Sequence, residues 1–211
     1  MAHAANARLA DLSRTDSLTG LANRRALDTT TADGPRQWTG AVLLIDLDHF
    51  KRVNDEHGHA HGDEVLVAMG EALRANTRGD DLVLRWGGEE FLVVSHRLDI
   101  DTALLLAERI RDTLAARRFR GHDGRPMQVT CSIGAASLPV HPHRSGDLEA
   151  SIALADHALY RAKHEGRDRA LAASVPADAA IAATGDLRHD IERLDALGLL
   201  IWRTSPKPAA R

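Results

Sequence analysis

Four acidic residues close short apolar runs at two places in the chain. Asp46 and Asp48 end the run AVLLIDLD, and Glu89 and Glu90 follow a pair of glycines in RWGGEEF. Alternate residues of a strand point to one face, so the two aspartates should share a face. If the second pair lies on a neighbouring strand, the four carboxylates converge and repel unless a cation joins them. Oxygen ligands select a hard ion such as Mg²⁺, with Mn²⁺ as the alternative, and Mg²⁺ commonly shares its coordination with substrate phosphates.

Glycines and bases near these acids indicate a phosphorylated ligand. Gly87 and Gly88 lack a Cβ atom, so they permit unusual dihedral angles and let a ligand approach the backbone closely. Lys51, Lys163 and Arg167 could hold phosphate charge. Acids, glycines and bases together predict nucleotide chemistry.

Each signal alone has a simpler interpretation. Paired acids at a strand end are typical of solvated turns, and Gly-Gly is ordinary hairpin chemistry. An EF-hand in DLDHFKRVNDEHG is excluded, because Phe50 and Lys51 stand where a ligand and the central glycine are needed. The sequence also contains no GxxxxGK[ST] phosphate loop.

Three histidines at alternate positions raise the question of a zinc site. His57, His59 and His61 fall in HGHAHGDE, which we expect to form a loop between two helices, with no cysteine nearby. A solvated cluster without a metal is therefore favoured over zinc.

Periodicity predicts the elements that must position these groups. The fold class expected is α/β (α+β), with a central mixed, largely antiparallel sheet and helices packed on it, because two strands flanking the glycines are close enough to form a hairpin. The expected strands are 41–48, DLVLRW, EFLVVS and MQVTCSIGAAS; the expected helices are HFKRVNDEHG up to Gly58, residues 62–77, one after Asp101 and one after Asp147 as N-cap.

Composition bounds the class of protein. With 211 residues and 44% hydrophobic residues the chain can build a buried core, and its net charge of −3 gives no field for binding nucleic acid. Cys131, the single cysteine, excludes an internal disulfide and is predicted to be a small buried thiol. No apolar stretch is long enough for a membrane segment and the N-terminus does not resemble a signal peptide, so we expect a cytoplasmic location.

Five motifs in a fixed order give a specific resemblance. The segments DSLTGLANRR, LIDLDHFKRVNDEHGHAHGDEVL, RWGGEEF, SIGAA and ADHALYRAKHEGRDR closely resemble the GGDEF-domain diguanylate cyclases over about residues 14–172. The resemblance implies a fold like the palm of class III nucleotide cyclases and polymerases. It also implies condensation of two GTP molecules to cyclic di-GMP with release of two pyrophosphates.

The resemblance also implies roles for individual residues. Asp46 and the carbonyl of Leu47 would bind magnesium, and Glu89 would be both a metal ligand and the base for the attacking 3′-hydroxyl, supported by Glu90. The substrate contacts implied are Asn54 and Asp63 on the guanine edge, His59 near the substrate, Gly87 and Gly88 beside it, and Lys51, Lys163 and Arg167 on the triphosphate. For Asp48, direct ligation and a supporting or helix-capping role both stay open.

The resemblance implies a partner and a form of control. Because each domain would hold one GTP, the cyclic product requires a homodimer with two domains facing each other. Arg78 and Asp81 form an RxxD just before the hairpin, matching the family's product-inhibition site for cyclic di-GMP. The alternative is a silent regulatory domain that binds GTP or cyclic di-GMP; the enzyme is favoured because the hairpin acids and Asp46 are all present.

The chain is predicted to have three parts. Residues 1–13 would be a short helix or the stump of a connector, 14–173 the catalytic domain, and 174–211 an appendage. The appendage has one amphipathic helix at about 186–197, which we expect to pack on the domain or on a partner subunit, and a disordered end, TSPKPAAR. Whether the chain is a standalone enzyme or a domain cut from a longer protein stays open, and a phosphodiesterase is excluded because there is no room for a second catalytic domain.

Overall fold

A computed structural model describes residues 14–27, 39–141, 148–176 and 187–204. The connector expected at 1–13, the proposed cap Asp147 and the C-terminal residues 205–211 lie outside the described residues.

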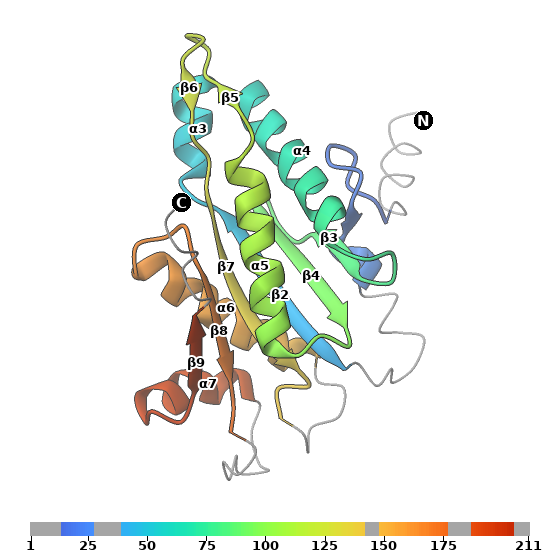
Figure 1. Ribbon diagram of the computed structural model, residues 1–211, viewed down its shortest axis with the longest axis vertical. Coiled ribbons are helices and arrows are strands. Elements are labelled where there is room, and N and C mark those ends of the chain that lie inside the picture. Colours follow the sequence, from blue (N-terminus) through green and yellow to red (C-terminus); the bar gives the residue numbers. More distant parts are fainter. Residues whose placement is uncertain (1–13, 28–38, 142–147, 177–186, 205–211) are drawn as a thin grey trace, which may run out of the picture.

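A seven-stranded sheet forms the centre of the described chain (Figure 1). Its order is β1 (Ala22–Asn23), β3 (Leu82–Arg85), β4 (Glu90–His96), β2 (Gly40–Leu47), β7 (Cys131–Leu138), β8 (Ala170–Ser174) and β9 (Ile201–Thr204). The pairs β1–β3 and β7–β8 are parallel, and the other pairs are antiparallel. A separate small hairpin joins β5 (Phe119–Arg120) to β6 (Pro126–Met127). The predicted fold class, a mixed and largely antiparallel sheet wrapped by helices, is confirmed.

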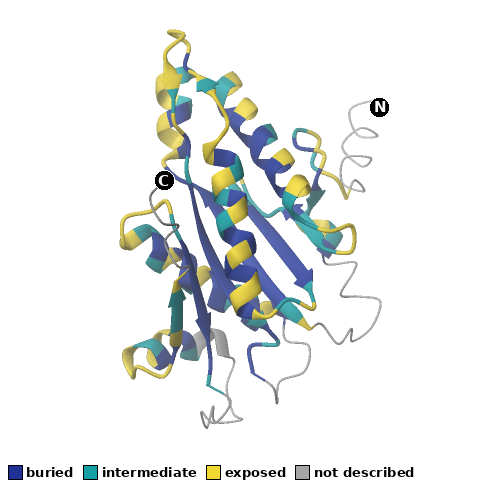
Figure 2. Ribbon diagram, viewed as in Figure 1, coloured by how far each residue is buried: buried dark blue, intermediate teal, exposed yellow. Residues whose placement is uncertain are grey.

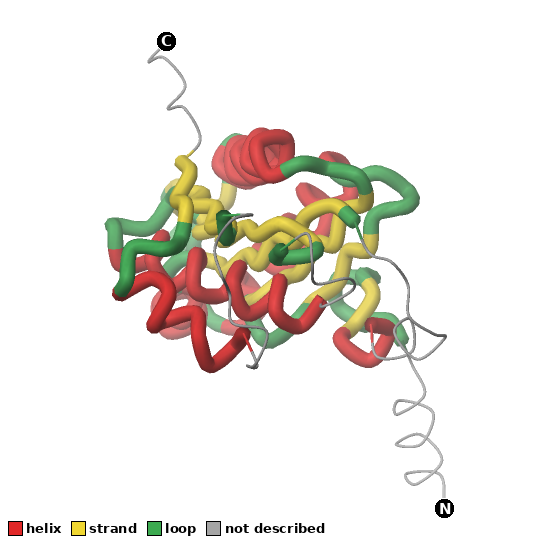
Figure 3. The backbone as a smooth tube through the Cα atoms, turned by 90° about the horizontal axis from the view of Figure 1, so that it is seen from below, coloured by secondary structure: helices red, strands yellow, loops and turns green. Residues whose placement is uncertain are grey.

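Helices cover both faces of the sheet, as the end-on view shows (Figure 3). One layer contains α3 (Phe50–His57), α4 (His59–Asn76) and α5 (Ile100–Ala115), and the other contains α6 (Leu148–His164) and α7 (Leu187–Ala196). The strand β2 is buried on both sides: Leu43 and Ile45 join the core under α4 and α5, whereas Val42 and Leu44 join the core under α6 (Figure 2). This alternation turns Asp46 toward the α6 layer.

Two helix starts differ from the sequence prediction. The helix α4 begins at His59, not at residue 62, because Gly58 at φ 86° ends α3 and turns the chain directly into the next helix. The expectation that His57, His59 and His61 lie on a loop is therefore wrong, because His57 ends α3 and the other two lie in α4. The helix α5 begins at Ile100, where the side chain of Asp99 accepts a hydrogen bond from the backbone N–H of Thr102 at 2.7 Å.

The C-terminal part of the chain adds to the sheet. Pattern reasoning missed β8 and β9, because the run ALAAS lacks the β-branched residues typical of strands and β9 has only four residues. The strand β9 pairs antiparallel with β8, and α7 packs on α6 with Ile191 and Leu194 buried. In the part of the chain that is described, no helix combines the length and the apolar character needed to cross a membrane.

Candidate functional site

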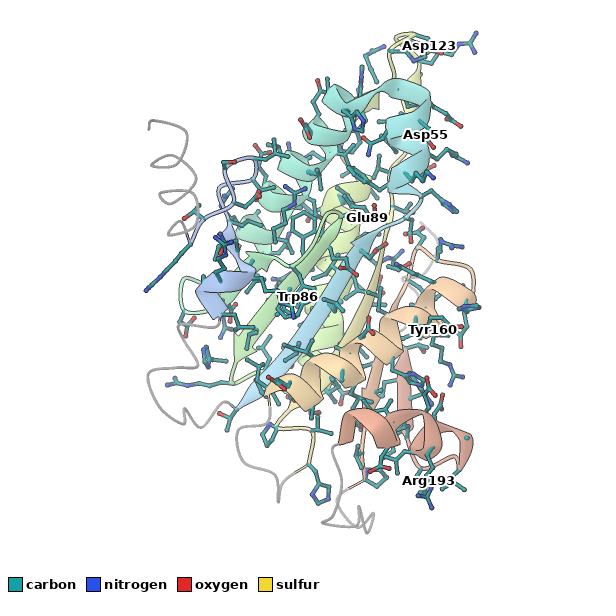
Figure 4. The ribbon with its side chains drawn as sticks, turned by 180° about the vertical axis from the view of Figure 1, so that it is seen from behind. Asp55, Trp86, Glu89, Asp123, Tyr160 and Arg193 are labelled. Atoms are coloured by element: carbon teal, nitrogen blue, oxygen red, sulfur yellow. The ribbon has the colours of Figure 1, made fainter. Side chains whose placement is uncertain are left out.

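The acidic residues of the two motifs meet at one end of the central strands. The strand β4 lies beside β2 in the register that places Asp46 opposite Glu90, and the N–H of Leu47 donates to the carbonyl of Glu89 at 3.3 Å. Asp46 is buried, with 5% of its surface exposed, whereas Glu89 and Glu90 are half-buried. We call Asp46, Glu89 and Glu90 the acidic edge; Figure 4 labels Glu89 at the hairpin end of the central strands.

A lysine from the opposite helical layer reaches the acidic edge. The Nζ atom of Lys163, near the C-terminal end of α6, lies 2.8 Å from a carboxylate oxygen of Asp46. Burial nevertheless raises the pKa of Asp46, and Lys163 opposes that shift only in part. Burial and the charge of Asp46 also raise the pKa of Glu89 and of Glu90. The acidic edge is therefore short of positive charge even with Lys163 in contact.

The donors at this edge fit a hard divalent cation. The carboxylates of Asp46 and Glu89 and the carbonyl of Leu47 offer oxygen only, which suits Mg²⁺ or Mn²⁺. Within the described ranges, no group of three or more His, Cys, Asp or Glu side chains is arranged to hold a metal ion. A cation here would complete its coordination with backbone, water and phosphate oxygens, which is the usual habit of Mg²⁺.

The hairpin glycines matter because they have no side chain. Neither Gly87 nor Gly88 has a positive φ, so a left-handed backbone is not what these glycines supply. A Cβ on Gly87 would lie 2.7 Å from Oε2 of Glu90, whereas Gly88 has open space beside it. Gly87 thus makes room for an acid of the site, and Gly88 leaves the backbone accessible.

Polar contacts that the sequence did not predict hold the glycine hairpin in place. Arg85 donates to the carbonyl of Gly88 at 2.6 Å and forms an ion pair with Asp16 at 3.2 Å. Asp16 also accepts hydrogen bonds from the N–H and hydroxyl of Thr19, at 2.8 and 2.7 Å. The segment DSLTGL is therefore a turn that holds the glycine hairpin. The signal was available, since Asp16 and Thr19 have the spacing of a capped turn.

A pocket of about 430 Å³ opens beside Glu89. Side chains of α3 and α4 that were predicted to contact guanine or phosphate line this pocket together with residues of the glycine hairpin. The lining residues are Phe50, Lys51, Asn54, His59, Asp63, Leu66, Arg85, Gly88 and Glu89. Gly62 shapes this pocket, since a Cβ there would lie 2.0 Å from the side-chain oxygen of Asn54. The role of Gly62 was not predicted and is visible only once α3 and α4 are packed.

Asp48 lies beside the acidic edge but is engaged elsewhere. Its oxygens accept hydrogen bonds from the hydroxyls of Ser132 at 2.7 Å and Thr130 at 2.8 Å, and from the N–H of Asp168 at 3.1 Å. These bonds fasten the loop after α6 to the end of β2. Of the two roles left open for Asp48, this geometry favours the supporting one.

The other predicted residues fall at separate places. Arg167 is exposed on the loop after α6, with φ 61°, and its N–H donates to the carbonyl of Ala162 at 3.0 Å. Arg78 is exposed before β3, and Asp81 accepts from the N–H of Arg78 at 2.8 Å and from the hydroxyl of Ser95 at 2.6 Å. The Arg78–Asp81 pair thus stands at the far end of β3 from the hairpin, roughly 20 Å away at about 3.3 Å per strand residue.

The histidines and the cysteine have surroundings of their own. Nδ1 of His57 lies 3.2 Å from Nδ1 of His122 in the β5–β6 hairpin, with the ring of His61 nearby. The sequence pattern contained His61 and His57 but did not bring His122 to them. Cys131 is buried, and burial raises the pKa of its thiol.

Comparison with known proteins agrees with the motif order. The family model described as "Diguanylate cyclase, GGDEF domain" matches residues 13–169. The diguanylate cyclase DgcM of Escherichia coli K12 is 43% identical over 163 residues, covering 75% of this chain and 38% of DgcM. The diguanylate cyclase DgcP of Pseudomonas aeruginosa is 42% identical over 160 residues, covering 74% of this chain and 23% of DgcP. The chain therefore spans well under half the length of these relatives.

Solved structures support the same assignment. The GGDEF domain of DgcB from Caulobacter crescentus, solved in complex with c-di-GMP, superposes with a TM-score of 0.68 and 31% identity, covering 76% of this chain and 95% of that domain. The active GGEEF domain of a diguanylate cyclase from Vibrio cholerae has a TM-score of 0.61 and 32% identity, covering 71% of this chain and 96% of that domain. The sheet order, the acidic edge and these matches agree, and the chain belongs to the GGDEF-domain diguanylate cyclase family.

Proposed function

We propose that this chain condenses two GTP molecules to cyclic di-GMP and releases two pyrophosphates. The observation that carries the proposal is the position of Asp46 and Glu89. The two acids lie side by side, with the pocket of Asn54 and Asp63 on one side and the cationic end of α6 on the other. A guanine base would enter the pocket and pair with the amide and carboxylate, while its triphosphate would extend along the hairpin toward Lys163. A single pocket of this kind holds one GTP, so the two-nucleotide product requires a homodimer.

The chain's own groups supply acid–base and electrostatic chemistry. Glu89 would accept the proton of the 3′-hydroxyl, and its raised pKa brings it closer to the operating pH that suits a general base. Lys51, on α3, and Lys163 and Arg167, at the end of α6, would hold the triphosphate and offset charge on the departing pyrophosphate. The open backbone at Gly88 leaves room for the phosphates.

Asp46, the carbonyl of Leu47 and Glu89 would hold Mg²⁺, with Mn²⁺ as a substitute and Glu90 supporting the site. When bound, such an ion polarises the phosphoryl group under attack and lowers the charge on it. Because Lys163 already contacts Asp46, its ammonium is within reach of any phosphate bound at the same edge.

We further propose product inhibition at Arg78 and Asp81. Arg78 is exposed, and the carboxylate of Asp81 is held by Ser95 and by the backbone of Arg78, so a positioned acceptor stands beside an exposed cationic donor. This pair lies at the opposite end of β3 from the acidic edge, so cyclic di-GMP bound here would act by arresting the two domains and not by blocking the pocket.

The test is incubation of the chain with GTP and Mg²⁺, followed by chromatography and mass identification of the product. Wild type should form cyclic di-GMP, and Glu89→Ala should lose at least about a thousandfold in turnover, because both the proposed base and a metal ligand disappear. Asp112→Ala, which removes an exposed acid from α5, is the matched control and should turn over normally. Equal product from wild type and Glu89→Ala would refute the assignment.

Turnover per subunit should also fall on dilution, and a constant value over a hundredfold range would count against a weakly associating dimer.

A further inference from the structure

The C-terminal unit, defined as α7 and β9 with the turn between them (residues 187–204), lies against the helix that carries the proposed triphosphate ligands. It lies outside residues 13–169, which the family model matches, so family membership assigns it no role. Its apolar side chains Ile191, Leu194 and Leu200 are buried in the core that α6 shares. In Figure 4, α7 lies directly below α6.

Polar contacts join the C-terminal unit to the last turns of α6. Asp195 accepts a hydrogen bond from Nε1 of Trp202 at 3.1 Å and lies 2.8 Å from Nε2 of His157. The guanidinium of Arg161 lies 3.8 Å from Asp195 and stacks over the Trp202 ring, 4.3 Å from its centroid. An isolated exposed ion pair contributes little, but Arg161 also has an aromatic face to rest on.

Arg161 also contacts residues of the loop after α6, which carries Arg167. Nε of Arg161 lies 2.7 Å from Glu165, and Glu165 lies 3.3 Å from Nη1 of Arg169. Nε of Arg169 donates to the carbonyl of Arg167 at 3.2 Å. The hydrogen bond from Arg161 lowers the pKa of Glu165, and the charges of Arg161 and Arg169 add to that effect. Contacts therefore run without a break from Asp195 to the backbone of Arg167.

The loop needs this support because its backbone is strained. Arg167 and Asp168 have φ values of 61° and 46°, a left-handed conformation that costs about 1 kcal/mol or more for each non-glycine residue. One side of the loop is held by Asp48, which accepts from the N–H of Asp168, and by Arg111, 2.6 Å from the Asp168 carboxylate. On the other side, the backbone N–H of Arg167 donates to the carbonyl of Ala162 at 3.0 Å, and the side-chain contacts run through Glu165 and Arg169.

We propose that the C-terminal unit is a positioning element for the triphosphate, acting through Arg161 on the loop that carries Arg167. The inference rests on the proposed function, in which Arg167 contacts the triphosphate. Arg161, Asp195 and Trp202 are positioning residues, since they act through the loop and not on the nucleotide. Loosening the C-terminal unit should therefore weaken binding of the triphosphate while leaving the guanine pocket unchanged.

The experiment compares GTP and GMP binding to the full chain by calorimetry. Arg161→Ala and Trp202→Ala should each weaken GTP binding about tenfold and change GMP binding by less than about twofold, since GMP lacks the β and γ phosphates. Arg193→Ala, an exposed arginine on the side of α7 away from α6 in Figure 4, is the matched control and should bind GTP as wild type does. Equal losses for GTP and GMP would overturn the proposal.

A double-mutant cycle tests whether Arg161 affects GTP binding through Arg167. If Arg161 acts through Arg167, then Arg161→Ala should cost nothing further in an Arg167→Ala background, and additive losses would overturn the proposal. Hydrogen exchange at the Arg167 amide, which donates to Ala162, reads the loop without nucleotide and should accelerate in Arg161→Ala. Unchanged exchange overturns the coupling itself, whereas a wild-type chain that binds no GTP overturns the proposed function, so the two failures are distinguishable.

Discussion

Two aspartates on either side of Leu47 should respond to mutation in opposite ways. The carboxylate of Asp48 receives hydrogen bonds from Ser132, Thr130 and the Asp168 N–H, at 2.7, 2.8 and 3.1 Å. Asp48→Ala leaves the fully buried Ser132 hydroxyl without its acceptor, which costs about 1–3 kcal/mol, and it also removes the acceptor of two partly buried donors, whose contribution is smaller. We expect a total loss of roughly 2–4 kcal/mol in the free energy of unfolding.

Asp46 should behave as a functional acid instead. Its pKa is raised by burial, so its charge disfavours the folded state at neutral pH, and Asp46→Asn removes that charge while keeping an oxygen for Lys163. We expect stability within about 0.5 kcal/mol of wild type, or slightly above it, and loss of turnover.

The assay is thermal unfolding followed by circular dichroism at pH 7, beside GTP turnover. For a chain of this length a loss of about 3 kcal/mol lowers Tm by roughly 6–12 °C. In a Ser132→Ala background, the cost of Asp48→Ala should fall by about 1 kcal/mol or more, because the orphaned hydroxyl is absent. The reasoning is wrong if Asp46→Asn destabilises the fold more than Asp48→Ala, or if the cost of Asp48→Ala does not depend on Ser132.

Further changes probe other parts of the site. Gly62→Ala should displace the Asn54 amide and raise KM for GTP about tenfold with a near-normal Tm; an unchanged KM would contradict the role of Gly62. Arg85→Ala should free the hairpin turn and lower kcat about tenfold or more, with turnover equal to wild type as the contrary result. Cys131 should resist alkylation at pH 8 until the chain unfolds, because burial raises its pKa, and rapid labelling of the native chain would be inconsistent with that. In the metal-free chain, the raised pKa values of the acidic edge mean that the native state binds more protons than the unfolded chain above about pH 4, so these groups destabilise the fold as pH rises. Tm should therefore fall less between pH 4 and pH 7 in a Glu89→Gln/Glu90→Gln variant than in wild type, and Mg²⁺ should raise the wild-type Tm at pH 7.

The fold class was predictable because its main elements have strong local patterns. The aliphatic run of β2, buried on both faces, and the two strands around Gly87 and Gly88 carried the central sheet, and the acids at their ends identified the site. The last two strands along the chain, β8 and β9, were not predictable. The run ALAAS has no strand-forming residues, and β8 forms because β7 offers it a partner, which is information outside its own sequence.

The residues of the site also fall into those that the sequence predicts and those that it does not. Residues whose chemistry is directed at a ligand, such as Asp46 and Glu89, stand out by type and position, whereas residues that act on other residues become visible only through packing. Nothing about Gly62 in sequence indicates that it yields space to Asn54, and nothing about Arg85 indicates Asp16, 69 residues away.

The loop after α6 is held by contacts of unequal strength, which involve Asp48 on one side and Arg161 on the other. Two consecutive residues there adopt left-handed angles; a buried carboxylate holds one side, and a backbone hydrogen bond to Ala162 together with exposed charged groups holds the other. The buried anchor should set whether the loop forms at all, since its loss leaves donors unsatisfied inside the protein. The exposed side is weaker and screened by salt, so it should set how well the loop is ordered. Because that side is controlled by α7 and β9, a change at the C-terminal end of the chain should adjust triphosphate binding without unfolding the domain.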